Sequence, residues 1–118
     1  MKKSHQFKYL LNKLDVNKPI NLVLSGGGIR DIAHIALLEY LQEKGFRINR
    51  IVGCGTGALV SAFYCSGLQP NDILNFFKSN PIYRYVWTRP IKAKRIDSKK
   101  YISEINNYVE PTFEELKI

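Results

Sequence analysis

Cysteine and acidic residues are scarce in this 118-residue chain, and long apolar runs are missing. A helix between its two cysteines, Cys54 and Cys65, would hold them about 15 Å apart, so we expect free thiols and a reducing, cytoplasmic setting. No stretch is long enough to span a bilayer. Charges at Lys8, Lys13 and Asp15 leave no apolar core for a signal peptide near the N-terminus.

The shortage of acids leaves 18 Lys and Arg against 10 Asp and Glu, a formal net charge of +8. Most of the excess positive charge falls between Lys78 and Lys100. In this segment Asp97 is the one acid among eight Lys and Arg residues, which are interleaved with aromatic residues. Such a segment can bind anionic lipid headgroups, bind nucleic acid through stacked bases, or form a solvated loop. We expect no nucleic acid, and the residues expected to contact a lipid surface peripherally are Arg84, Trp87, Arg89, Lys92, Lys94 and Arg95.

The spacing of apolar residues predicts alternating strands and helices. A buried strand at 20–24 should be followed by a helix at 32–44, and a second strand at 51–52 should be followed by a helix at 56–66. Elements in this order, joined by crossovers of this length, favour one α/β domain over residues 1–118. Its strands should be parallel and covered on both faces.

Further helices flank this unit. Helices are expected at 71–79 and from 97 or 98 to 109, with a final turn at 113–116, while 82–87 is either a strand or an irregular loop. A short N-terminal amphipathic helix would carry Phe7, Leu10, Leu11 and Leu14. Helix 71–79 should pack inward through Ile73, Leu74, Phe76 and Phe77. The apolar residues of the other two helices are Ile32, Ile35, Leu38 and Leu41 in 32–44, which recur at helical spacing, and Tyr101, Ile102, Ile105 and Val109 in the helix that ends at 109.

Both predicted strands end in glycines. The first runs into Ser25-Gly26-Gly27-Gly28-Ile29-Arg30-Asp31, with Asp31 expected as the N-cap of the next helix. Consecutive glycines let backbone N–H groups converge at a helix N-terminus, where the helix dipole favours an anion. The second runs into Gly53-Cys54-Gly55-Thr56-Gly57, which matches the strand, turn and helix of a nucleophile elbow, G-x-S-x-G. Its apex, Gly55, has no side chain.

Together these motifs resemble those of the patatin-like phospholipases, which are serine lipid acyl hydrolases. The family's G-G-G-x-[RK]-G is similar to residues 26–31, and its G-x-S-x-G is similar to residues 53–57. The resemblance is tight over residues 20–68, and 112–116 also resembles the family. It implies the N-terminal part of a three-layer α/β/α domain with a mainly parallel sheet. It further implies a lipid or acyl ester substrate, with neither cofactor nor metal.

The resemblance also assigns roles to residues. It places the oxyanion hole at Gly26, Gly27, Gly28 and Arg30, and it places Gly53 and Gly57 on either side of the apex. Gly55 stands where the family has its nucleophilic serine. That serine works with an aspartate from a later D-G-[GA] motif, which this chain does not contain. We therefore expect the polypeptide as written to be catalytically inactive.

A third departure is Asp31, which replaces the last glycine of the first motif. It would put a carboxylate beside a site meant to stabilise negative charge. Cys54 and Thr56 could replace the missing nucleophile, but residues flanking an elbow apex point elsewhere. His34 is expected to pack or cap rather than act as a base.

Two other functions are compatible with the same residues. A noncatalytic module of the same fold would bind lipid or a partner protein, and an uncovered sheet edge would favour self-association. A dinucleotide site would use Gly53-x-Gly55-x-x-Ala58, with Asp72 as the ribose acid. That acid should end a strand, however, and Asp72 follows a turn that starts a helix.

Overall fold

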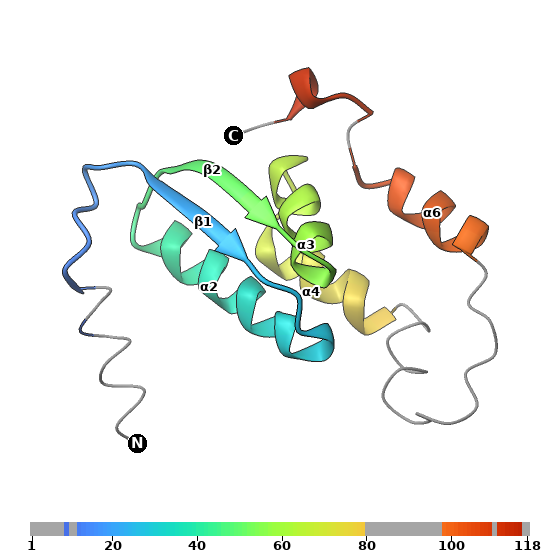
Figure 1. The fold of residues 1–118 in the computed structure, drawn as a ribbon, viewed down its shortest axis with the longest axis horizontal. Helices are drawn as coiled ribbons and strands as arrows, with labels where there is room; N and C mark the ends of the chain where they lie inside the picture. The colour runs from blue at the N-terminus through green and yellow to red at the C-terminus, as the bar shows by residue number, and fades with distance from the viewer. Residues whose placement is uncertain (1–8, 10–11, 80–97, 110, 117–118) are drawn as a thin grey trace.

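A computed structural model describes residues 9, 12–79, 98–109 and 111–116 (Figure 1). Its elements in chain order are β1 (Ile20–Leu24), the 3-10 turn η1 (Gly28–Asp31), α2 (Ile32–Glu43), β2 (Ile48–Gly53), α3 (Thr56–Cys65), α4 (Pro70–Ser79), α6 (Ser98–Asn106) and η2 (Phe113–Glu115). The N-terminal helix predicted at Phe7, Leu10 and Leu11 and the segment 82–87 lie outside the described residues. Leu14, which is described, is exposed and lies outside any helix.

The two strands pair in parallel. Leu22 lies opposite Ile51 and Leu24 opposite Gly53, with an irregularity between Ile20 and Asn21. Helix α2 makes the crossover between the strands, because a parallel pair cannot be closed by a short hairpin. The α/β class with a parallel sheet, predicted from the sequence, is confirmed.

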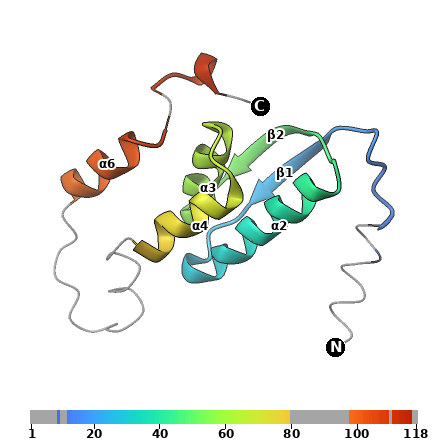
Figure 2. The same cartoon turned by 180° about the vertical axis from the view of Figure 1, so that it is seen from behind.

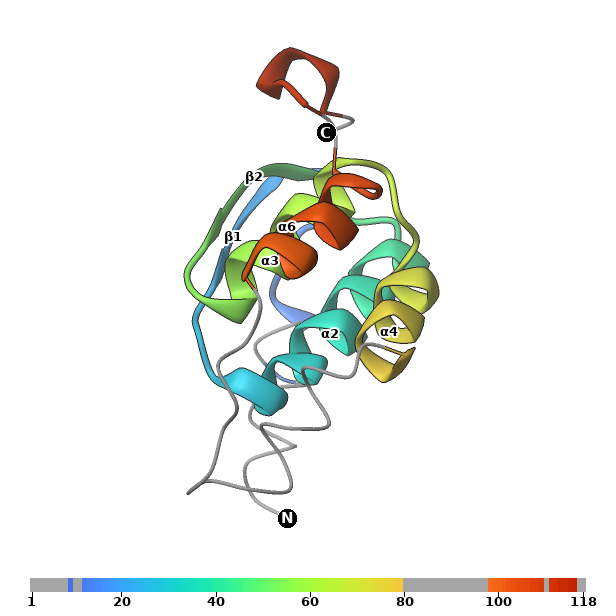
Figure 3. The same ribbon diagram turned by 90° about the vertical axis from the view of Figure 1, so that its right-hand side faces the viewer.

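Helices α2, α3 and α4 lie on the same face of this sheet. Figure 3 shows the sheet nearly edge-on, with all three helices on one side of it. Figure 2, the view from the opposite side to Figure 1, shows α2 and α4 toward the viewer. Leu24 is buried beneath them, whereas Val23 and Val52 are paired in register and are 77% and 62% exposed. The expectation of strands covered on both faces is therefore wrong for the part of the chain that the structure describes.

The core lies between the sheet and these three helices. Phe63 of α3 is at its centre, with its ring centroid 4.7 Å from that of Phe76 and 5.9 Å from that of Tyr108, both edge-to-face. Such aromatic pairs add about 0.5–1.5 kcal/mol beyond the area that they bury. The buried core residues are Leu24, Ile35, Leu38, Val60, Phe63, Ile73, Phe76 and Phe77.

Two apolar residues of the predicted helices are exposed. Ile32 is exposed at the start of α2. Residues spaced by three are rotated about 60° short of a full helical turn at each step, so Ile32 lies on a different side of the helix from Leu38 and Leu41. The helix predicted to end at 109 ends at Asn106. Ile102 is exposed because this part of the chain meets the core through Ile105, near the end of α6, and through Val109 beyond it, both of which are partly buried. The side chain of Tyr101 lies outside the described part.

Candidate functional site

The glycine ends of β1 and β2 meet at one edge of the sheet. Parallel strands end on the same side, and the Cys54 N–H donates to the Leu24 carbonyl oxygen at 3.0 Å. A Cβ built on Gly55 would lie 3.5 Å from the Cα of Gly26. The structure therefore brings the two predicted motifs into contact.

Gly55 is the apex of a tight strand-to-helix turn. Its backbone has φ 57° and ψ −128°, a combination that residues with a Cβ adopt only under strain. The Gly57 N–H donates to the Cys54 carbonyl at 3.0 Å, and the Ala58 N–H donates to the Gly55 carbonyl at 3.1 Å. The turn thus reverses the chain direction and starts α3 within very few residues.

The glycines on either side of the apex are required by close backbone packing. A Cβ on Gly53 would lie 2.5 Å from the Cα of Ala58, and a Cβ on Gly57 would overlap the Leu24 carbonyl oxygen. Ser61, which is buried, donates its hydroxyl to the Gly57 carbonyl at 2.7 Å. The start of α3 therefore presses directly against the end of β1.

Asp31 turns its side chain back onto the first glycine loop. The Gly27 N–H donates to Asp31 Oδ2 at 3.0 Å, and Asp31 is only 3% exposed. Asp31 is at the N-cap position of α2, as predicted, but its side chain makes no cap hydrogen bond to the helix. The physical reason is that η1 runs into α2 without a break, so Asp31 already has helical dihedral angles, φ −72° and ψ −9°.

His34, one turn along α2, connects both ends of this loop. Its Nε2 lies 2.8 Å from the Ser25 carbonyl oxygen, to which it donates, and 3.3 Å from Asp31 Oδ1. A ring nitrogen that donates here cannot at the same time accept a proton. His34 therefore holds the loop in shape, as a packing or capping residue would.

The hydrogen bond between Gly27 and Asp31 was not predicted from the sequence. The available signal was Asp31 at the last position of the motif, four residues after Gly27, which has no side chain to block the approach of the carboxylate. Arg30, predicted beside the same loop, is exposed. The residues predicted for a lipid surface, Arg84, Trp87, Arg89, Lys92, Lys94 and Arg95, lie outside the described residues.

The two cysteines are free thiols, as expected, but their surroundings differ. Cys54, beside the apex, is exposed, whereas Cys65 at the end of α3 is buried. Burial raises the pKa of the Cys65 thiol. The pKa of the Tyr64 hydroxyl is raised by burial and, to a smaller extent, by the neighbouring Cys65. Asp72 lies in the first turn of α4 and not at a strand end, so the context for a dinucleotide site is missing.

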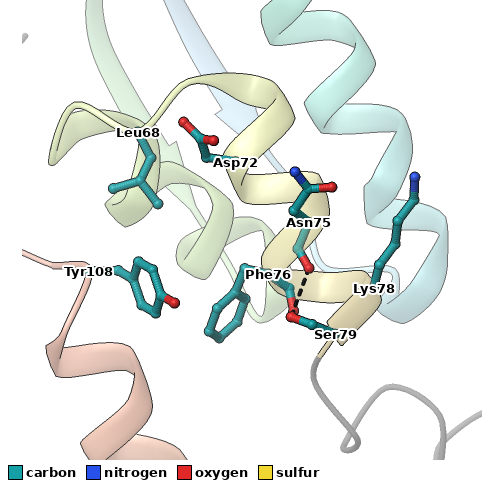
Figure 4. A pocket seen from close by; sticks show the side chains of 7 residues that line it. All are labelled: Leu68, Asp72, Asn75, Phe76, Lys78, Ser79 and Tyr108. Atoms are coloured by element: carbon teal, nitrogen blue, oxygen red, sulfur yellow. Dashed lines mark hydrogen bonds between the residues drawn. The ribbon is translucent and has the colours of Figure 1, made fainter.

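An open hollow of about 700 Å³ lies beside α4 (Figure 4). Phe76 and Tyr108 supply apolar surface, and Asp72 and Lys78 supply charge, but no lining residue belongs to either glycine motif. Within the described residues, no three His, Cys, Asp or Glu side chains gather as a metal site would require. The described helices include none with the length and apolar character needed to cross a membrane.

Comparison with known proteins agrees with the glycine motifs. An uncharacterised protein of Bacillus subtilis (strain 168), YqhO, is 44% identical over 54 residues, which cover 46% of this chain and 19% of that protein. Neuropathy target esterases (sws) of Drosophila persimilis and Drosophila grimshawi are each 49% identical over 47 residues, or 40% of this chain and 3% of theirs.

These relatives are thus far longer than the part that this chain matches. No solved structure matches the chain. The sequence model of the family described as patatin-like phospholipase matches residues 22–116, which is most of the chain and includes both glycine motifs. The chain therefore belongs to the patatin-like phospholipase family.

Proposed function

We propose that this chain is a lipid acyl hydrolase-type domain, with its oxyanion loop at Gly26–Arg30 and its nucleophile elbow at Gly53–Gly57. The observation that carries the proposal is the backbone of Gly55, held at φ 57° and ψ −128° at a strand-to-helix turn beside Gly26. Membership of the patatin-like phospholipase family and the similarity to Drosophila neuropathy target esterases support the same reaction class.

The proposed geometry has a clear chemical logic. A hydroxyl at the apex would attack an acyl carbonyl, and backbone N–H groups of the glycine loop would receive the oxyanion that forms. Preorganised donors of this kind act without reorganising during the reaction, so the loop would be the part that stabilises the transition state. Residue 55 supplies no hydroxyl, and none of Asp15, Asp31, Asp72 and Asp97 stands in a D-G-[GA] context. The proposal is therefore of a site that lacks its nucleophile and its base in these 118 residues.

The test of inactivity is hydrolysis of p-nitrophenyl acyl esters. We expect a rate no faster than that of a heat-denatured control, because loss of the nucleophile removes covalent catalysis. A fluorophosphonate probe, which labels activated serines, should leave the protein unlabelled. Turnover that falls in proportion to fluorophosphonate labelling would contradict the proposal.

A noncatalytic role of the same fold is the second candidate. The side-chain-free apex and the basic composition favour a domain that binds acyl lipid at an anionic membrane surface without hydrolysing it. In that case we propose a cytoplasmic, peripheral protein. Sedimentation with anionic and neutral vesicles tests this, and equal binding to the two would remove it.

A further inference from the structure

We propose that Asp31 is an internal anion that occupies the glycine loop and excludes external carboxylates from it. The inference rests on the proposed function in one respect, because it takes the Gly27 N–H as a donor for substrate. Its structural part, the occupation of that donor by Asp31, stands independently on the geometry below.

The contact has the properties of a bound anion. Asp31 Oδ2 accepts the Gly27 N–H at 3.0 Å, and the carboxylate is almost completely buried. A carboxylate that accepts from a backbone N–H makes a charge-assisted hydrogen bond, which is about twice as strong as a neutral one. The donor is therefore already satisfied within the chain.

A second side chain lies beside the carboxylate. Asp31 Oδ1 lies 3.3 Å from His34 Nε2, which donates to the Ser25 carbonyl oxygen at 2.8 Å. Ser25 and Asp31 are the two ends of the loop, so His34 connects them across it. No described buried side-chain polar atom lacks a hydrogen-bond partner, which agrees with a closed network.

Gly27 makes this arrangement possible. A Cβ built on Gly27 would lie 2.8 Å from Asp31 Oδ1, too close for the carboxylate to remain where it is. The glycine that would give a substrate oxygen close access to the loop gives that access to Asp31 instead. A second anion approaching the Gly27 N–H would have to displace a buried carboxylate and would meet its negative charge.

The experiment compares the native protein with Asp31→Gly, which restores the residue that the family motif has at this position. NMR follows exchange of the Gly27 amide proton, and the same amide shift is recorded during titration with octanoate. We expect exchange about tenfold faster or more in Asp31→Gly, because a charge-assisted acceptor is lost. We also expect an octanoate-dependent shift of Gly27 in Asp31→Gly that the native protein does not show.

Controls separate occupation of the loop from general loosening. Asp15→Gly removes another carboxylate that accepts a backbone N–H, that of Asn17 at 2.9 Å, and it should leave Gly27 unchanged. Octanol, with the same chain length and no charge, should not shift Gly27 in either protein. If Asp31→Gly does not fold, Asp31→Ala removes the acceptor, keeps a Cβ, and should still speed Gly27 exchange.

The outcomes assign any failure to its source. Faster exchange together with a saturable octanoate shift supports the proposal. Unchanged Gly27 exchange in Asp31→Gly or Asp31→Ala overturns it and leaves the proposed function standing. Faster exchange without an octanoate shift overturns the exclusion role, and in that case the assignment of the loop as an anion site falls with it.

Discussion

At the scale of single residues, the backbone conformation of Gly55 decides which residues the apex of the turn accepts without strain. Its φ of 57° and ψ of −128° are natural for glycine and strained for serine. A Cβ at this position would be 3.5 Å from the Cα of Gly26, an ordinary contact. Serine would therefore fit in space, and its cost would come from the backbone alone.

We expect Gly55→Ser to lower the free energy of unfolding. Backbone strain of about 1–3 kcal/mol should outweigh the ~0.5–1 kcal/mol gained by removing glycine's excess backbone entropy. Denaturant unfolding measures this, and Gly55→Ala is the matched control because it adds the Cβ without the hydroxyl. The serine variant should not hydrolyse esters unless additional chain supplies a D-G-[GA] aspartate. An unchanged or raised denaturation midpoint would mean that the turn is not a strained elbow.

The sequence predicted which residues form the two glycine motifs, but not what Asp31 does. Asp directly before a helix is the usual sign of an N-cap, and the local pattern contains nothing against that interpretation. The outcome depends on η1 giving Asp31 helical dihedral angles and on Gly27 leaving room for its carboxylate. Both features depend on the three-dimensional arrangement of the loop and cannot be predicted from the spacing of residues along the sequence.

At the scale of elements, β1 and the first helices were predictable because their apolar periods are clear and glycines interrupt them. The second strand was predicted at 51–52, but β2 begins at Ile48, because the exposed Asn49 and Arg50 conceal its first half in the sequence. Helix α3 begins at Thr56 and α4 ends at Ser79, as the spacing predicts. The exposure of Ile102 was not predictable, because it depends on how far α6 extends from the core. The end of β1 and Gly57 of α3 pack so closely that no space is left for a Cβ on residue 57.

We expect Gly57→Ala to destabilise the protein by about 1–3 kcal/mol, although alanine is the better helix former. The added Cβ would overlap the Leu24 carbonyl oxygen and lie 2.7 Å from that of Ser25, both in backbone that cannot move freely. Ala36→Gly, at an exposed position of α2, is the control for propensity and should destabilise by about 1 kcal/mol. Thermal and urea unfolding would detect a stabilised Gly57→Ala, which would contradict the packing described.

At the scale of the whole molecule, the described fold has helices on one face of its sheet and exposed valines on the other. Parallel sheets are normally covered on both faces, and unpaired strand edges invite further pairing. Val23 and Val52 form a small apolar surface beside those edges. The isolated chain should therefore self-associate or have only marginal stability.

We expect sedimentation equilibrium to show association that Val52→Lys weakens, because a charge on the exposed face opposes its burial. Ile102→Lys, at an exposed position of α6, should leave association unchanged. The melting transition should lie below roughly 65 °C, the upper end of the usual mesophile range. A sharp monomer with a cooperative transition above that temperature would argue against an open sheet face.

The unequal surroundings of the two thiols give the protein a built-in reporter. Only thiolates react with maleimide dyes, and Cys65 is 6% exposed with its pKa raised by burial, whereas Cys54 is exposed next to Gly55. Near neutral pH we expect one dye per native chain and two after denaturation, with Cys54→Ser abolishing native labelling. Two dyes on the native chain, counted by mass spectrometry, would contradict the burial of Cys65. A fluorophore on Cys54 would then signal any molecule entering the edge where both strands end, without an engineered attachment site.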